Sequence, residues 1–218
     1  MKKSNQGFTL VEIAIVLVII GLLLGGILKG QEMITQAKIK NVIADVSGVS
    51  AAMYGYQDRY KALPGDDKNA TRWTGATAGN GDGIIVGKWT EAAKESLEYW
   101  DHLGRAGFIS SGGAANPFNA VSGKIGVQTG DGSGTTPAGI LSDGLATPTK
   151  FSALIMCTAN LPDKIAISVD AQMDDGNGQK GNVRSMKQTT GPNPTDIAAT
   201  ADAYSEDGVS TYVVCRQL

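Results

Sequence analysis

A single carboxylate lies inside the most apolar part of the sequence. Residues 8–28 are apolar except for Thr9, Glu12 and several glycines. A carboxylate within hydrocarbon costs about 2.5 kcal/mol or more, so a simple membrane anchor does not explain Glu12. Its position indicates a partner group that receives the charge. The alternative is an ordinary anchor that carries an incidental acid.

The remaining titratable residues do not form a catalytic constellation. The sequence has no histidine-paired nucleophile, no phosphate-binding loop and no metalloprotease helix. His102 is the only histidine, and we expect it to serve in packing or helix capping. Glu95 and Glu98 are expected on the solvated face of a helix. The sequence therefore predicts that the protein is not an enzyme.

Two acidic, glycine-rich segments could provide oxygen ligands for calcium, the only cofactor that the sequence suggests. Neither has the full twelve-residue EF-hand pattern, so plain turns closed by Asp and Asn side chains are the favoured alternative. The later segment is the better candidate. The residues are Asn80, Asp82 and Gly83 in the first segment, and Asp174, Asp175 and Asn177 in the second.

Cys157 and Cys215 are the only cysteines. An even number of cysteines in an exported protein predicts a disulfide, whereas the cytosol would keep both reduced. A bridge that closes this long segment would contribute about 3 to 4 kcal/mol.

Length and charge restrict the class of protein. The chain of 218 residues is long enough for one domain with a core, and its net charge of −2 does not indicate a nucleic-acid-binding surface. Beyond the first thirty residues the sequence is rich in glycine and small polar residues. That composition is typical of a loop-rich, extracytoplasmic domain.

The apolar run is long enough to span a bilayer as a helix and too long for an ordinary secretory signal. We therefore expect it to remain in the mature protein. Lys2 and Lys3 precede the run. By the positive-inside rule they place the N-terminus in the cytoplasm and everything after Lys29 outside.

The junction between the basic segment and the apolar run resembles the cleavage and methylation motif of type IV prepilins and type II secretion pseudopilins. The matching residues are Gly7, Phe8, Thr9, Leu10, Val11 and Glu12. The resemblance implies that a prepilin peptidase cleaves between Gly7 and Phe8 and methylates the new amino group of Phe8. It also implies that Glu12 pairs with the N-terminal amine of a neighbouring subunit and sets the subunit register.

As a function, the resemblance implies a structural subunit of a type IV pilus or a type II secretion pseudopilus. The expected partners are other subunits, the peptidase, the inner membrane and an assembly platform, but no nucleic acid. The protein would begin as a single-pass inner-membrane protein and end in a periplasmic or surface filament. The alternative is a membrane-tethered binding or adhesion module that does not polymerise, in which Glu12→Ala would leave function intact.

One feature departs from many pilins, which carry a proline late in the apolar run. Here Gly25 and Gly26 are the weak point of the helix. They either unwind on polymerisation or allow close helix packing.

Apolar residues at three- and four-residue spacing continue from Gln31 to Tyr60, which predicts an amphipathic extension of the membrane helix. Pro64 and Gly65 are expected to end it. The expected organisation is a leader (1–7), a transmembrane half (8–28) and an amphipathic half (29–62) of a spine helix, and a globular head (63–218).

Within the head, residues 64–89 read as a surface loop anchored by Trp73 and Trp89. Thr90 is expected to cap a second helix that runs to about Gly104, with Ala93, Leu97, Trp100 and Leu103 on its buried face.

The end of the sequence predicts a sheet. We expect strands at 124–128 and 211–214, with the disulfide joining the latter to the region of 155–158. Residues 165–173 alternate in polarity and favour a strand, although a helix begun by Pro162 and Asp163 also fits. The predicted fold class is α+β, pilin-like, with an antiparallel sheet packed on the spine helix.

Overall fold

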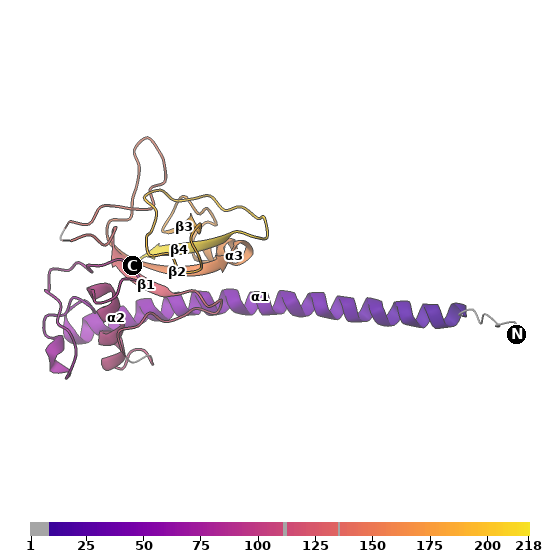
Figure 1. Cartoon of the computed structure of the whole chain (residues 1–218), viewed down its shortest axis with the longest axis horizontal. Helices are drawn as coiled ribbons and strands as arrows, with labels where there is room; N and C mark the ends of the chain where they lie inside the picture. The colour runs from indigo at the N-terminus through magenta and orange to yellow at the C-terminus, as the bar shows by residue number, and fades with distance from the viewer. Residues whose placement is uncertain (1–8, 111–112, 135) are drawn as a thin grey trace, which may run out of the picture. The chain divides into compact units, whose positions relative to one another are not determined.

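The protein has the α+β architecture that the sequence predicts (Figure 1). The computed structural model describes residues 9–110, 113–134 and 136–218. The chain divides into two compact units, one ending at Ala37 and one comprising Lys38–Leu218, and α1 contributes to both. In chain order the elements are α1 (Leu10–Tyr60), the 3-10 helix η1 (Ala70–Arg72), α2 (Glu95–Arg105), β1 (Ile125–Thr129), β2 (Leu154–Pro162), α3 (Asp163–Met173), β3 (Val183–Lys187) and β4 (Thr211–Gln217).

In the first unit, α1 exposes its large apolar side chains from Leu10 to Leu28. Among the described helices, α1 alone is long and apolar enough to cross a membrane. The expected transmembrane helix is therefore present by length and composition.

In the second unit, α1 buries one face, as the spacing of its apolar residues predicts. The helix ends at Tyr60, before Pro64 is reached, because Lys61 adopts a left-handed conformation with φ 53°. The Lys61 amide still donates to the carbonyl of Gln57 at 2.8 Å. The buried residues are Ile39, Val42, Val46, Val49, Ala52, Met53 and Tyr56.

The four strands form one antiparallel sheet in the order β1-β2-β4-β3. The predicted strands at 124–128 and 211–214 are confirmed as β1 and β4. Strand β3 was not predicted from the sequence. It pairs with β4 through five residues, from Val183↔Arg216 to Lys187↔Tyr212.

The two faces of the sheet have different covers. On one face, Met156 of β2 and Val127 of β1 share a core with Val49 and Met53 of α1. The other face is covered by loops. Its core contains Trp89, Ile140, Leu141, Phe151 and Ala201, packed on Ile155, Cys157, Val213 and Cys215 of the central strands.

The favoured strand at 165–173 was wrong, and the alternative helix is present as α3. Pro162 occupies the N-cap position, and Asp163 lies in the first turn. Ile165, Ala166 and Val169 are buried against the sheet and α1. The alternating polarity fitted either element, and burial of this helical face decided between them.

The second helix begins at Glu95 rather than at Thr90, which does not cap it. Ala93 has a φ of 56°, which is not helical, and it precedes the helix. It therefore does not lie on the buried helical face. Trp100 and Leu103 are fully buried as expected, and Leu97 packs against the same core.

The segment 64–89 is a loop with one 3-10 turn, and Trp89 anchors it with a fully buried ring, while Trp73 is half-buried. More of this loop is buried than we predicted. Asp66, Asp67 and Ile85 are all buried.

Loops bond to the outer edges of both edge strands. Along β1, the amide of Thr129 donates to the carbonyl of Ile85 at 3.2 Å. Along β3, the amide of Ser185 donates to Gly178, and the amide of Asp202 donates to the carbonyl of Ser185 at 2.8 Å. Such cover blunts the unpaired edges that would otherwise pair with another chain.

We predict that Gly126→Ala destabilises the second unit. A Cβ at Gly126 would overlap the carbonyl oxygen of Trp89 and lie 2.8 Å from its Cε3 atom. Overpacking of this kind costs about 1 to 3 kcal/mol, which would appear as a lower unfolding midpoint of the full chain in detergent. Gly48→Ala is the control, because a Cβ there meets nothing within 4 Å and should stabilise α1 by ~1 kcal/mol. Equal midpoints for the two variants would contradict this packing.

Candidate functional site

The predicted cleavage site, Gly7 and Phe8, lies outside the described residues. Glu12 is described, and it lies in the first turn of α1. Its carboxylate oxygen Oε2 accepts a hydrogen bond from the amide of Thr9 and another from the Thr9 hydroxyl, both at 2.8 Å. The Thr9 hydroxyl in turn accepts from the amide of Glu12 at 3.3 Å.

The two bonds that involve backbone amides form a capping box, in which the N-cap residue and the residue three positions later satisfy each other's backbone groups, and the bond between the two side chains adds to it. The positive end of the helix dipole also favours a carboxylate there. The chain itself therefore supplies part of the stabilisation that Glu12 needs in an apolar setting. Thr9 was predicted as part of the motif but not as a helix cap, although the Thr-X-X-Glu spacing is a recognised signal for a helix start.

The second carboxylate oxygen of Glu12 is not used by the capping box. Among the described residues, none donates a hydrogen bond to Oε1. An oxygen in this position could accept from an ammonium group, the chemistry that the prepilin resemblance implies.

The glycine pair at 25 and 26 does not interrupt the helix. α1 is continuous through both residues, and a Cβ at either would meet nothing within 4 Å. The two alternatives for this pair, unwinding on polymerisation and close helix packing, both remain predictions.

The predicted disulfide is confirmed. Cys157 of β2 and Cys215 of β4 are bonded and directly opposite each other in the sheet register. Both are fully buried on the loop-covered face. The bond joins residues 58 positions apart and fixes the last strand to the centre of the sheet.

Three carboxylates gather where α3 ends. Asp170, Asp174 and Asp175 each offer an oxygen, and these oxygens lie within 4.8 Å of one another. Asn177, the third predicted ligand, follows in the next turn, and its role stays a prediction. The pKa of Asp170 is raised to about 6, mainly by burial and in part by the charges of Asp175 and Asp174. Hydrogen bonds from Tyr204 and Gly176 oppose this rise.

Hydrogen-bond donors of the described chain engage all three carboxylates of this acidic cluster. Asp170 accepts from the Tyr204 hydroxyl at 2.8 Å, and Asp174 accepts from the amide of Asn182 at 2.6 Å. The Asp175 carboxylate accepts a hydrogen bond from the backbone amide of Asn177 at 2.8 Å. Of these three bonds, the one between Asp175 and Asn177 is of the kind that the turn alternative predicts, and the calcium site remains a prediction.

The first acidic segment also consists of turns. Asn80 and Asp82 bond each other, and the Asp82 carboxylate accepts from the amide of Ile84 at 2.9 Å. The amides of Gly81 and Gly83 donate to the buried carboxylate of Asp66. Asp66 holds this loop, a role that the sequence did not indicate.

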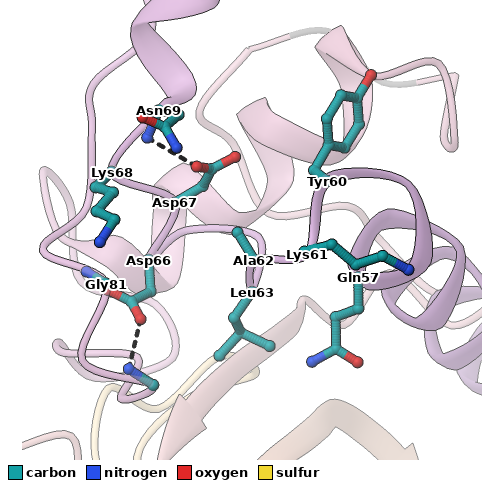
Figure 2. Close-up of a pocket in the computed structure, with 11 residues that line it drawn as sticks. Gln57, Tyr60, Lys61, Ala62, Leu63, Asp66, Asp67, Lys68, Asn69 and Gly81 are labelled. Carbon is teal, nitrogen blue, oxygen red and sulfur yellow. Dashed lines mark hydrogen bonds between the residues drawn. The ribbon is translucent and has the colours of Figure 1, made fainter.

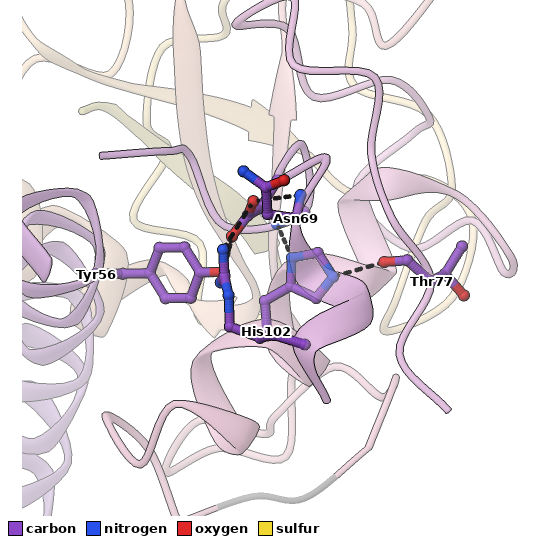
Figure 3. A network of polar contacts seen from close by, with 7 residues as sticks. Tyr56, Asn69, Thr77 and His102 are labelled. Atoms are coloured by element: carbon purple, nitrogen blue, oxygen red, sulfur yellow. Dashed lines mark hydrogen bonds and ion pairs between the residues drawn. The ribbon is translucent and has the colours of Figure 1, made fainter. Parts of the chain in front are cut away.

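His102 has the packing role that we expected. Its ring is fully buried, its Nδ1 accepts from the amide of Gly65 at 2.9 Å, and its Nε2 can donate to the carbonyl of Thr77 at 2.8 Å (Figure 3). The ring stacks on Tyr56 of α1 with centroids 6.4 Å apart. His102 therefore ties the long loop to α2 and α1.

A second buried carboxylate, Asp67, completes this network. It accepts from the Tyr56 hydroxyl at 2.7 Å and from Arg72 at 2.7 Å. Burial alone would raise the pKa of Asp67. The hydrogen bonds from Arg72, from the Tyr56 hydroxyl and from the backbone amide of Asn69 outweigh burial and lower the pKa.

Beside this network is a polar cavity of about 500 Å³, which is within the size range of small-ligand sites (Figure 2). Its lining comes from the end of α1 and from the following loop. The lining residues are Gln57, Tyr60, Lys61, Ala62, Leu63, Asp66, Asp67, Lys68, Asn69, Gly81 and Gly83.

Glu95 is not simply a solvated residue. Its carboxylate accepts from the amide of Val86 at 2.9 Å, and burial raises its pKa, aided by the charges of Asp66 and Asp82. Glu95 fixes the loop to the start of α2. Its described hydrogen-bond partner is a backbone amide, not a nucleophile or a base.

The sequence was compared with known proteins. Residues 2–28 match the family model of the prokaryotic N-terminal methylation motif. The searches of curated proteins and of solved structures found no match. The match covers the segment that contains Thr9 and Glu12 and does not extend into the second unit.

We predict that Thr9→Ala weakens the first turn of α1. The substitution removes the hydroxyl that bonds Glu12, and loss of such a cap costs about 1 kcal/mol. Amide hydrogen exchange of the full chain in detergent micelles should become faster at the start of the helix. Thr9→Ser keeps the hydroxyl and should exchange like the parent, and identical exchange in Thr9→Ala would exclude the capping role.

The calcium hypothesis predicts that millimolar Ca²⁺ raises the thermal unfolding midpoint at neutral pH. A bound cation would relieve the repulsion among the three carboxylates of the acidic cluster. Asp175→Asn should diminish the rise, whereas Asp82→Asn, in the other acidic segment, should not. A midpoint that calcium leaves unchanged would favour the turn alternative.

Proposed function

Because residues 2–28 carry the prepilin signature of type IV pilins and pseudopilins, we propose that this chain is a subunit of a filament of that class. In this proposal residues 1–7 are a leader that a prepilin peptidase removes, and Phe8 becomes the methylated first residue. Residues 8–28 hold the subunit in the inner membrane until it enters the filament.

The position of Glu12 carries the proposal. The capping box engages one carboxylate oxygen, and a neighbouring subunit's N-terminal amine would donate to the other. Each chain has one such acid and, after cleavage, one such amine. Repetition of the contact along a row of subunits would neutralise both charges and define the axial register.

The proposed partners are therefore other subunits, the peptidase, the inner membrane and an assembly platform. Lys2 and Lys3 support a cytoplasmic N-terminus, and the disulfide supports an oxidising compartment for the second unit. Residues 63–218 would form the head that the filament displays. The same arrangement serves a pilus or a secretion pseudopilus.

The proposal predicts that the protein purified from its host begins with N-methylated Phe8. Mass spectrometry of the intact chain and of its N-terminal peptide measures this directly. A chain that still begins at Met1 would contradict the proposal.

Glu12→Gln tests assembly separately from processing. Breaking a buried charge pair costs about 3 kcal/mol or more, so filament yield should fall at least about tenfold while the chain remains in the membrane. Glu32→Gln is the matched control, because Glu32 lies beyond the apolar run and pairs on the helix surface with Lys29 at 2.8 Å. Wild-type filament yield from Glu12→Gln would favour a tethered binding module that does not polymerise.

A further inference from the structure

The loop after α1 contains a possible acceptor for an N-linked glycan. Asn69, Ala70 and Thr71 form the tripeptide Asn-X-Thr, in which X is not proline. Every other asparagine in the sequence lacks a hydroxyl residue two positions later, except Asn193, whose following residue is Pro194. Asn69 is therefore the one asparagine in the sequence with this motif.

The surroundings of Asn69 suit an acceptor. Asn69 and Thr71 are both exposed, whereas Ala70 between them is fully buried and fixes the turn. Although Asn69 occupies the N-cap position of η1, its side chain makes no capping bond there. Its amide nitrogen Nδ2 donates no hydrogen bond within the described part of the chain.

Asparagines with a structural role in this protein behave differently. Asn119 is buried, and its Nδ2 donates to the Thr158 hydroxyl and to the Ala159 carbonyl, both at 2.7 Å. The Nδ2 of Asn116 donates to the carbonyls of Trp89 and Ile125 at 2.9 Å. Asn69 has no such function in the fold.

Asn69 also lines the polar cavity described above (Figure 2). The cavity measures about 500 Å³, enough for a hexose ring, and its lining includes the hydrogen-bonding side chains of Lys68 and, across the pocket from Asn69, Gln57. A sugar attached to Nδ2 would thus have polar groups within reach on the protein surface.

From the exposed motif and the adjoining cavity, we propose that Asn69 carries an N-linked glycan whose first sugar packs in this cavity. The donor is a polyprenyl-diphosphate-linked oligosaccharide, used by a membrane oligosaccharyltransferase. The Asn69 amide nitrogen bonds to C1 of the sugar and the bond from C1 to the diphosphate oxygen breaks. The amide gives up one proton to a base of the transferase, and polyprenyl diphosphate leaves.

The structure also indicates when the transfer happens. Asp67 and Ala70 are buried, and the Asp67 carboxylate is bound by Tyr56 and Arg72. A transferase needs this stretch of backbone to be accessible. Transfer therefore precedes packing of the loop against α1.

The inference rests on the proposed function, because it needs residue 69 on the outer side of the membrane. The test is expression of the full chain in a bacterium that makes the transferase and its lipid-linked donor. Intact-mass and peptide mass spectrometry should show the oligosaccharide on Asn69 and none on Asn193. Asn69→Gln and Thr71→Ala should both lose it, and Thr71→Ser should keep it because serine also supplies the hydroxyl.

The redox state of the cysteines separates the two possible failures. A chain with the Cys157–Cys215 bond formed and an unmodified Asn69 would overturn the inference and leave the proposed function intact. A chain with both thiols reduced would contradict the outward location and with it both proposals. Purified folded protein offered to the transferase should stay unmodified, and efficient modification there would overturn the order of events.

Discussion

The structure depends on how one carboxylate is accommodated in an apolar helix. Glu12 lies among side chains suited to hydrocarbon, where an unpaired charge is unfavourable. The Thr9 amide and hydroxyl bond one oxygen of Glu12 and place it at the positive end of the helix dipole. The chain can therefore accommodate the acid without any neighbouring molecule. A partner's ammonium would add to this stabilisation, since the second oxygen is not used by the cap.

The second unit is organised to be rigid around its central strands. α1 and α3 cover one face of the sheet, and long loops cover the other. Long loops cost conformational entropy, and this chain restrains them with buried polar contacts. Arg184 illustrates this, because its guanidinium donates to the carbonyls of Leu141 and Thr149 and lies 4.6 Å from the ring centre of Phe151.

The parts of the fold that the sequence predicted share a strong local pattern. The long apolar run, the spacing of buried residues in α1 and the β-branched end of the chain each allowed one interpretation. The segment 165–173 allowed two, because Ile165, Ala166 and Val169 suit a helix face while Ile165, Ile167 and Val169 suit a strand face. Pro162 and Asp163 were a local signal for the helix, and burial of the helical face against the sheet and α1 is what favours it over the strand.

Other features depended on contacts between distant residues. β3 contains Arg184 and Ser185, both buried, and polar residues of this kind hide a strand from pattern reasoning. The predicted start of α2 was wrong because Ala93 adopts a positive φ, which the residue type does not indicate. At the candidate site, Glu12 was recognised from its unfavourable setting. The capping role of Thr9 was not predicted, although the Thr-X-X-Glu spacing carries the signal for it.

The covered sheet edges would matter in the proposed filament, where many copies of the chain are concentrated. Identical chains with bare strand edges can stack through backbone hydrogen bonds into cross-β aggregates, whatever their helices do. Here loop backbone bonds to the outer side of both β1 and β3. This cover would disfavour pairing between the sheets of neighbouring molecules. Ordered association would then use surfaces other than the sheet edges.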